Sequence, residues 1–134
     1  MSIKVLIIDD KKEDIFSIRK SLKQAGFEYT YVEAKTGDKG LDKVREVLPD
    51  IVIVEVKLPN INGFDMCKRI KGISNTVKVL IVTRHQEGVD YAMATDASAD
   101  GHSVKTKSNK YLIASFKEIV EKLGIEKRVF ESNP

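Results

Sequence analysis

The sequence has few of the residues that mark disulfide-rich or membrane proteins. Its 134 residues include one cysteine, three prolines and no tryptophan. Because Cys67 has no second cysteine to pair with, an internal disulfide is excluded and a reducing cytoplasm is favoured. No apolar run approaches the roughly 20 residues that span a bilayer. The run between Lys4 and Asp9 has only the length of a strand, which is too short for a secretory signal.

Neither charge sign dominates the composition. Lysine and arginine number 23 and the acids 20, which leaves a net charge of +3. The basic residues are scattered and form no aromatic-laced stripe, so we expect neither a nucleic acid nor a membrane as partner. The length fits one domain, predicted over residues 1–124, with a C-terminal tail over residues 125–134.

Apolar runs rich in valine and isoleucine predict the strands. Three of them, Ile3–Ile8, Ile51–Val54 and Val77–Val82, lack polar alternation, which is typical of strands covered on both faces. Tyr29–Val32 is a further strand candidate. Asp100–Val104 is polar enough to predict a strand at the edge of the sheet.

Segments between these runs have helical spacing of apolar residues. The first such segment ends at Gly26, and Thr36 and Asn62 are predicted to cap the second and third. A weaker helix is expected over Glu87–Asp96, and an amphipathic closing helix follows Ser108. Five alternations of strand and helix predict a doubly wound α/β fold with one parallel sheet and five helices on its two faces.

Polar residues follow four of the predicted strands: Asp9 and Asp10, Glu55, Thr83, and Lys105. Because parallel strands end at one edge of a sheet, where open α/β folds bind ligands, we expect these side chains to meet. The sequence therefore predicts a site of acids, one hydroxyl and one ammonium.

This ordered set resembles the response-regulator receiver domain. The strongest stretch runs from Pro49 to Phe64 and is similar to the receiver pattern around the phosphoryl-accepting aspartate. The resemblance covers residues 3–123. It implies a flavodoxin-like five-stranded sheet with strand order 2-1-3-4-5.

The resemblance also assigns a metal site. Mg²⁺ prefers oxygen ligands and keeps several waters, so Asp10 would bind it directly and Asp9 largely through water. The carboxylate of Glu55 and the backbone carbonyl of Lys57 complete the implied ligand set, and the Lys57 side chain would add a second ammonium at the rim. A competing interpretation makes Asp10 the cap of the first helix, because Glu13 lies in capping-box register.

Further positions receive roles from the same resemblance. Thr83 would donate a hydrogen bond to a phosphoryl oxygen, and Lys105 would pair with its charge. His102 occupies the place of the aromatic switch residue. The competing interpretations are a turn residue, a surface lysine and an exposed edge-strand histidine. Arg84 would crowd or cover the pocket, and Thr106 stands where the family has proline, which predicts a trans bond after Lys105.

Glu55 departs from the family pattern because it places glutamate where receivers have aspartate. The extra methylene moves the carboxylate by about 1 Å, and a misplacement of that size can cost on the order of 10²-fold in rate. We therefore expect no ordinary phosphorylation. The longer side chain reaches toward Thr83 and Lys105, where its charge would favour an active-like state. The plainer alternative is a carboxylate that merely sits in an acidic pocket.

These observations predict a stand-alone, cytoplasmic, receiver-like signalling domain. It would act by binding a histidine kinase or a downstream effector, and homodimerisation stays open. We do not expect an enzyme, beyond self-phosphorylation and dephosphorylation with Mg²⁺ as the only candidate cofactor. The resemblance places the contact on the fourth helix, fifth strand and fifth helix, a region that includes Tyr91, Met93, His102, Lys107 and Tyr111.

Two alternatives remain from the sequence. A phosphorylation-competent response regulator would form an acyl phosphate on Glu55. A flavodoxin-like protein would bind FMN beside the first strand, where Asp9 and Asp10 would repel its phosphate.

Overall fold

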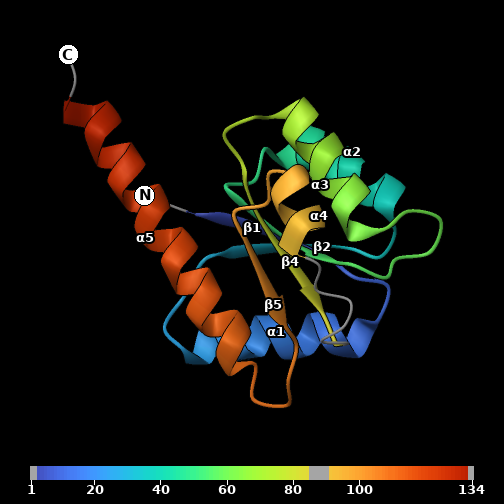
Figure 1. Cartoon of the computed structure of the whole chain (residues 1–134). Coiled ribbons are helices and arrows are strands. Elements are labelled where there is room, and N and C mark those ends of the chain that lie inside the picture. The colour runs from blue at the N-terminus through green and yellow to red at the C-terminus, as the bar shows by residue number, and fades with distance from the viewer. Residues whose placement is uncertain (1–2, 85–90, 133–134) are drawn as a thin grey trace.

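A computed structural model describes residues 3–84 and 91–132. Its five strands form one parallel sheet of order β2-β1-β3-β4-β5, which confirms the predicted fold class (Figure 1). The strands are β1 Lys4–Ile8, β2 Thr30–Ala34, β3 Ile51–Glu55, β4 Lys78–Thr83 and β5 Gly101–Val104.

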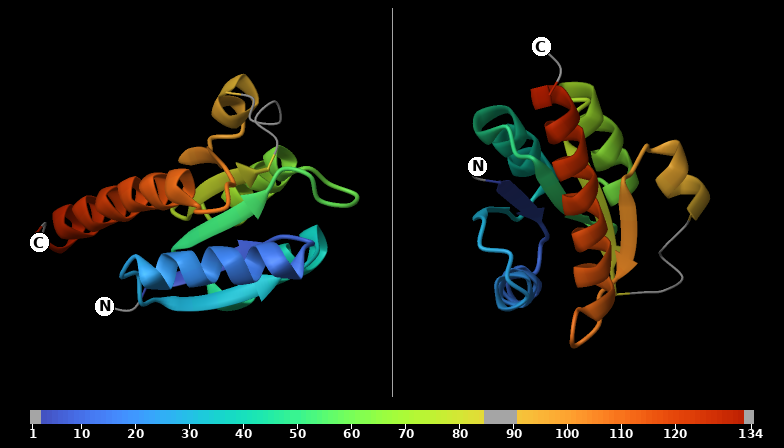
Figure 2. Two further views of the ribbon diagram at one scale, coloured as in Figure 1. Left: turned by 90° about the horizontal axis from the view of Figure 1, so that it is seen from below. Right: turned by 90° about the vertical axis from the view of Figure 1, so that its left-hand side faces the viewer.

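Five helices cover the two faces of this sheet, as Figure 2 shows. They are α1 Lys12–Gln24, α2 Gly37–Val47, α3 Gly63–Ile73, α4 Tyr91–Asp96 and α5 Lys110–Ser132. Apolar side chains of α1 and α5 belong to one core cluster, and those of α2, α3 and α4 belong to the other. The sheet therefore separates two cores.

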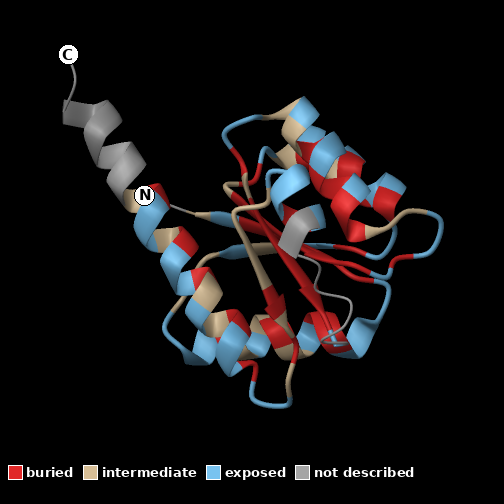
Figure 3. Ribbon diagram, in the orientation of Figure 1, coloured by how far each residue is buried: buried red, intermediate tan, exposed pale blue. Residues whose placement is uncertain are grey.

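The central strands are buried on both faces (Figure 3). Val5 and Ile7 of β1 face the core under α1 and α5, whereas Leu6 and Ile8 face the other core. All four residues are fully buried. Covering on both faces explains why these strands appear in the sequence as unbroken apolar runs.

Helix boundaries follow the predicted capping residues. The Thr36 side chain accepts a hydrogen bond from the Lys39 N–H at 3.1 Å, and Asn62 caps α3 in the same way. Gly26, with φ +97°, follows the end of α1. The interpretation of Asp10 as a cap is wrong, because Lys11 is the N-cap of α1 and its side chain makes no capping hydrogen bond.

Three elements differ from the prediction by more than a residue at one end. Strand β2 runs from Thr30 to Ala34, two residues later than expected at its end. Within Glu87–Asp96, the structure shows helix over Tyr91–Asp96, and residues 85–90 lie outside the described part. Helix α5 continues to Ser132, into the predicted C-terminal tail (Figure 1), because Glu, Lys and Arg at 126–128 are strong helix formers. The domain boundary after residue 124 stays a prediction.

Among the described residues, no helix combines the length and apolar character needed to cross a bilayer.

Candidate functional site

The carboxyl ends of four strands bring polar side chains to one edge of the sheet. Asp9 follows β1, Glu55 and Thr83 end β3 and β4, and Lys105 follows β5. All four side chains are buried, although charged residues are rarely buried without a partner. Four of the five residues that were expected to meet therefore lie buried at this edge, and their burial requires that the charges compensate one another.

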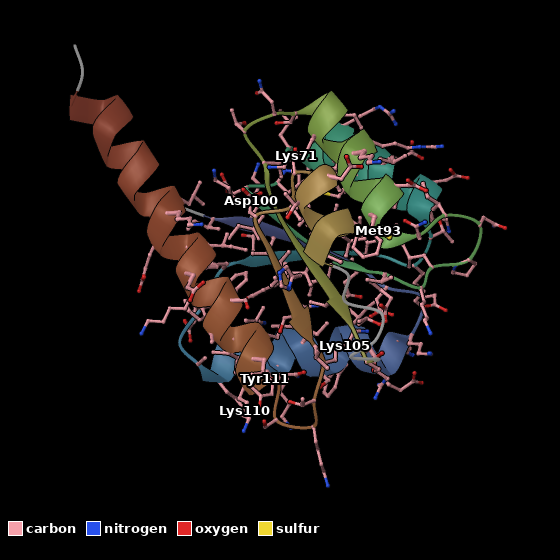
Figure 4. The ribbon with its side chains drawn as sticks, in the orientation of Figure 1. Lys71, Met93, Asp100, Lys105, Lys110 and Tyr111 are labelled. Carbon is pink, nitrogen blue, oxygen red and sulfur yellow. The ribbon has the colours of Figure 1, made fainter. Side chains whose placement is uncertain are left out.

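Lys105 supplies that compensation through its ammonium group. Its Nζ donates to Oδ2 of Asp9, to Oδ2 of Asp14 at 3.0 Å and to Oε1 of Glu55 at 2.9 Å. An ammonium has three protons, so each one meets a carboxylate. We call these four residues the Lys105 cluster; Figure 4 shows Lys105 at the end of β5 beside α1.

Asp14 is the member that the sequence analysis missed. It lies in the first turn of α1 and is buried, and its Oδ1 accepts from the Arg84 guanidinium as well. A signal was available, because Asp14 precedes the buried Ile18 by four residues and so lies on the inward face of the helix.

Asp10, by contrast, is exposed. The acidic oxygens that lie within 4.8 Å of one another belong to Asp9, Asp14 and Glu55. This all-oxygen set suits a hard cation such as Mg²⁺, so the residues present fit the implied metal. Asp14 takes the place in this set that was expected for Asp10. The role of Asp10 as a direct ligand stays a prediction.

The environment shifts three pKa values in the cluster. Burial, reinforced by the Glu55 charge, raises the pKa of Asp9 despite its bond to Lys105. Burial also disfavours the Asp14 carboxylate, but Lys105 and Arg84 outweigh it and lower the pKa of Asp14. For Lys105, burial is outweighed by Asp9 and Glu55, which raise its pKa. The ammonium is thus held charged, and burial disfavours the ionised form of Asp9.

Replacing Asp9 by asparagine should therefore stabilise the fold. A raised folded-state pKa means that ionised Asp9 disfavours folding at neutral pH, and that this penalty disappears as the pH falls below the ordinary value of 3.8. We expect Asp9→Asn to increase the free energy of unfolding by about 1 kcal/mol at neutral pH, measured by urea denaturation. The gain should shrink in acid.

The exposed neighbour provides the matched control. Asp10→Asn should change the free energy of unfolding by less than about 0.5 kcal/mol. A lower free energy of unfolding for Asp9→Asn at neutral pH would contradict the conclusion that burial disfavours the ionised carboxylate of Asp9.

Residues around the cluster complete its rim. The backbone N–H of Lys57 donates to Oε2 of Glu55 at 3.2 Å, whereas the Lys57 side chain is exposed. Arg84 was expected to crowd or cover the pocket, and its half-exposed side chain pairs with Asp14 at the rim. The Lys57 carbonyl as a metal ligand stays a prediction.

The switch positions lie on the last two strands. Thr83 is fully buried, and its carbonyl accepts from the Lys105 N–H at 2.7 Å. His102 is partly buried on β5, in register with Ile81 of β4. The bond between Lys105 and Thr106 is trans, as predicted. The signalling roles of Thr83, His102 and Thr106 remain predictions.

A cavity of about 530 Å³ lies beside the cluster, between α1 and the loop after β5. Lys105, Thr106 and Asn109 line it from the loop. The Asn109 side-chain amide donates to the hydroxyls of Ser17 at 3.0 Å and Ser21 at 2.9 Å. These bonds attach the loop that carries Lys105 to α1.

Comparison with known proteins gives one consistent family. The family model described as "Response regulator receiver domain" matches residues 5–117. Among curated proteins, the alkaline phosphatase synthesis transcriptional regulatory protein PhoP of Bacillus subtilis (strain 168) is 26% identical over 93% of this chain and 51% of its own length. Transcriptional regulatory protein AfsQ1 of Streptomyces coelicolor is 26% identical over 88% of this chain and 51% of its own. The chain spans about half the length of these relatives.

Solved structures share the fold of this chain. A CheY-like response regulator receiver domain protein from Methanospirillum hungatei JF-1 has a TM-score of 0.81 at 23% identity, covering 94% of this chain and 99% of that one. A putative response regulator from Chloroflexus aurantiacus J-10-fl has a TM-score of 0.77 at 26% identity, with 90% and 99% covered.

Proposed function

This chain belongs to the response regulator receiver family, and from that premise we propose that it signals by contact with a protein partner, without an ordinary phosphorylation cycle. Two-component signalling follows from the family, matched over residues 5–117. The proposal goes beyond the family in one respect, the absence of phosphoryl transfer to Glu55. Its support comes from the surroundings of the Glu55 side chain.

The engagement of both carboxylate oxygens of Glu55 carries the proposal. Oε1 accepts from Lys105 and Oε2 from the Lys57 backbone N–H, and the side chain is buried. A nucleophile needs an oxygen lone pair aimed at phosphorus from about 3 to 3.5 Å and in line with the leaving group. Glu55 is one methylene too long for that placement, and its hydrogen bonds hold it where it is.

The fixed negative charge of Glu55 can replace part of the charge that a phosphoryl group would supply. In the family scheme the lysine pairs with a phosphoryl group, and here Lys105 already pairs with Glu55 at 2.9 Å. A carboxylate carries about one charge, whereas a phosphoryl group carries about 1.5 to 2. Glu55 therefore favours the conformation of the phosphorylated state at all times, but with less charge than a phosphoryl group would supply.

The proposed contact surface is the α4–β5–α5 face, defined here by Met93, His102, Lys107 and Tyr111. The Tyr91 side chain, which the sequence also placed on this face, lies outside the described part of the structure. Met93 and Tyr111 are large apolar side chains that are 44% and 53% exposed, and Figure 4 shows them on α4 and at the start of α5. Apolar side chains ringed by polar ones suit a protein partner. A histidine kinase, a downstream effector and a second copy of this chain are the candidate partners.

A small phosphodonor tests the chemistry directly. With Mg²⁺ and acetyl phosphate, we expect the intact mass of the parent protein to stay unchanged. The Glu55 carboxylate is too far along to reach phosphorus in line, and its hydrogen bonds to Lys105 and Lys57 hold it there. Glu55→Asp shortens the side chain and should gain the mass of one phosphoryl group. Glu55→Gln, which keeps the length but removes the nucleophile, is the matched control and should remain unlabelled.

A phosphoryl adduct on Glu55 in the parent would overturn the proposal and establish the phosphorylation-competent alternative. Beryllofluoride offers a second measurement, since a DrrB receiver domain that is 25% identical to this chain is described as BeF₃-activated. Amide chemical shifts near Thr83 should respond to beryllofluoride in Glu55→Asp and not in the parent. A response in the parent would count against the proposal in the same way.

A further inference from the structure

Strand β2 is an open edge of the sheet. It stands first in the order β2-β1-β3-β4-β5, so only one of its sides pairs with another strand (Figure 2). The N–H of Thr30 and the C=O of Ala34 form hydrogen bonds of 3.0 and 3.1 Å with backbone groups at the two ends of β1. Because backbone groups alternate in direction along a strand, the N–H and C=O groups of Tyr31 and Glu33 point away from the sheet.

Three devices that often protect an exposed strand are missing from Thr30–Ala34. Native sheets block their edges with proline, with bulges and with unpaired charges. The register between β1 and β2 is unbroken over these five residues, and none of them is proline. Their one charged side chain, Glu33, pairs with Arg19 at 2.9 Å. Strand β2 is therefore a regular template to which another strand can add.

Hollows lie on both sides of this edge. One has a volume of about 540 Å³ and is lined by α1 and Glu33. The other has a volume of about 380 Å³ and is lined by Glu33, Ala34, Lys35 and α2. Successive side chains of a strand point to opposite faces, so a strand added beside β2 would place its side chains alternately in the two hollows. We call the outer side of β2 and these two hollows the β2 edge site.

The two hollows differ in chemistry. On the α1 side, Ile15 and Phe16 supply apolar surface, and the Phe16 ring is 67% exposed. On the α2 side, Lys35 and Lys39 are exposed, and neither pairs with an acid in the described part of the chain. An added strand therefore meets an apolar surface on one face and ammonium groups on the other.

Positive charge dominates around the edge. Seven basic and three acidic side chains line the two hollows, although the chain as a whole is nearly balanced, with 23 basic and 20 acidic residues. Each of the three acids already has a basic partner within 3.6 Å. The β2 edge site is thus complementary to an acidic occupant.

We propose that the β2 edge site binds an extended segment of a partner protein in which apolar and acidic residues alternate. The segment adds a strand beside β2 and forms hydrogen bonds with the outward backbone groups of Tyr31 and Glu33. Its apolar side chains lie over Phe16, and its carboxylates reach Lys35 and Lys39.

Other occupants match the β2 edge site less well. A second copy of this chain would bring the same positive charge to the edge. A helix has its backbone groups bonded internally, and a nucleic acid has no peptide groups, so neither can continue the sheet. No residue of the site belongs to the Lys105 cluster or to the α4–β5–α5 face, and the inference therefore does not depend on the proposed function.

A designed peptide tests the proposal. The probe is a fluorescein-labelled peptide of alternating valine and glutamate, and its binding to the full chain is followed by fluorescence anisotropy. We expect saturable binding, with amide hydrogen exchange at Tyr31 and Glu33 slowed about tenfold in the complex, because newly bonded amides exchange only when the added strand opens. A peptide of the same composition without the alternation should bind about tenfold more weakly.

Substitutions at one position separate backbone pairing from side-chain contact. Glu33→Pro removes the outward N–H and leaves the side of β2 that faces β1 unchanged, and edge strands tolerate proline at such positions. We expect this variant to bind the peptide about tenfold more weakly. Glu33→Gln removes the same charge but keeps the N–H, so it is the matched control and should bind as the parent does. Thermal melting checks that both variants fold.

N-methylated peptides give a measurement on the parent protein itself. In an antiparallel complex the valine N–H groups would face β2, because directly paired residues share a face of the sheet, whereas in a parallel complex the glutamate N–H groups would do so. Methylation of the valine amides or of the glutamate amides should therefore abolish binding in one peptide and be tolerated in the other.

A charge reversal tests the α2 side of the site. Lys39→Glu should weaken binding of the peptide about tenfold, because it replaces attraction by repulsion at the acidic face of the added strand. Lys117→Glu makes the same change at an exposed position of α5, and it should leave binding unchanged.

Several results would overturn the inference. They are the absence of saturable binding, equal binding by Glu33→Pro and the parent, unchanged hydrogen exchange at Tyr31 and Glu33, and equal effects of the two methylation patterns. A dimer of the chain that Glu33→Pro dissociates, or tighter binding of a single-stranded oligonucleotide than of the peptide, would assign the edge to another occupant and overturn it as well. None of these results depends on whether Glu55 is phosphorylated, so failure here and failure of the proposed function are distinguishable.

Discussion

Replacing Lys105 by methionine is expected to lower the free energy of unfolding by about 3 to 5 kcal/mol, because removing one partner of a buried ion pair leaves the other charges uncompensated. The loss is large because a single ammonium serves three carboxylates. Methionine keeps much of the side-chain volume, so the change reports on charge more than on packing. Urea denaturation at neutral pH measures the effect.

Lys107→Met is the matched control, because Lys107 lies in the same loop and is exposed. Its effect should stay below about 0.5 kcal/mol. Mg²⁺ provides a second measurement. A ligand that binds only the folded state stabilises it by mass action, and the vacated cluster of Asp9, Asp14 and Glu55 is an oxygen-only set. The unfolding midpoint should rise more with Mg²⁺ in Lys105→Met than in the parent, and equal responses would contradict the role assigned to the ammonium.

Gly63→Ala should destabilise the fold by roughly 1 to 3 kcal/mol, the usual size of an overpacking effect. A Cβ atom on Gly63 would lie 2.5 Å from the carbonyl oxygen of Glu55 and 2.9 Å from Cα of Val56. Both contacts are to backbone, so the segment that carries Glu55 has to shift. Chemical denaturation measures the loss, and the amide shifts of Glu55 report the displacement.

Gly72→Ala tests the same chemical change in the same helix, with the opposite expectation. No atom lies within 4 Å of the position of its Cβ, and alanine favours helix over glycine by about 0.5 to 1 kcal/mol. Gly72→Ala should therefore stabilise the protein. Stabilisation by alanine at both Gly63 and Gly72 would show that helix propensity, not close approach to β3, decides the outcome.

Much of the fold was predictable because the parallel strands are covered on both faces. Complete burial makes Ile51–Val54 apolar at every position, and strand ends such as Glu55 and Lys105 then converge at one edge of the sheet. The strand order came from the family resemblance rather than from periodicity. The helix caps at Thr36 and Asn62 could be predicted because each side chain bonds to a backbone N–H only three residues further along the chain.

The site was predicted less completely, for reasons of local geometry. Successive residues at a strand end point to opposite sides, so Asp9 and Asp10 do not enter the cluster together. Asp14 reaches the cluster from the first turn of α1. Only the packing of α1 against the sheet shows that the Asp14 carboxylate contacts Lys105. Which oxygens the ammonium contacts depends on side-chain conformation, and sequence spacing carries no information about that.

The link between Asn109 and α1 has a mechanical consequence. Because the Asn109 amide bonds to the hydroxyls of Ser17 and Ser21, the segment bearing Lys105 and the helix bearing Phe16 are joined at a second point besides the ion pair with Asp14. A rearrangement that moves this loop away from α1 must break these two hydrogen bonds as well as the ion pair between Lys105 and Asp14. The loop that carries Lys105 and the helix α1 are therefore expected to move together when the cluster rearranges.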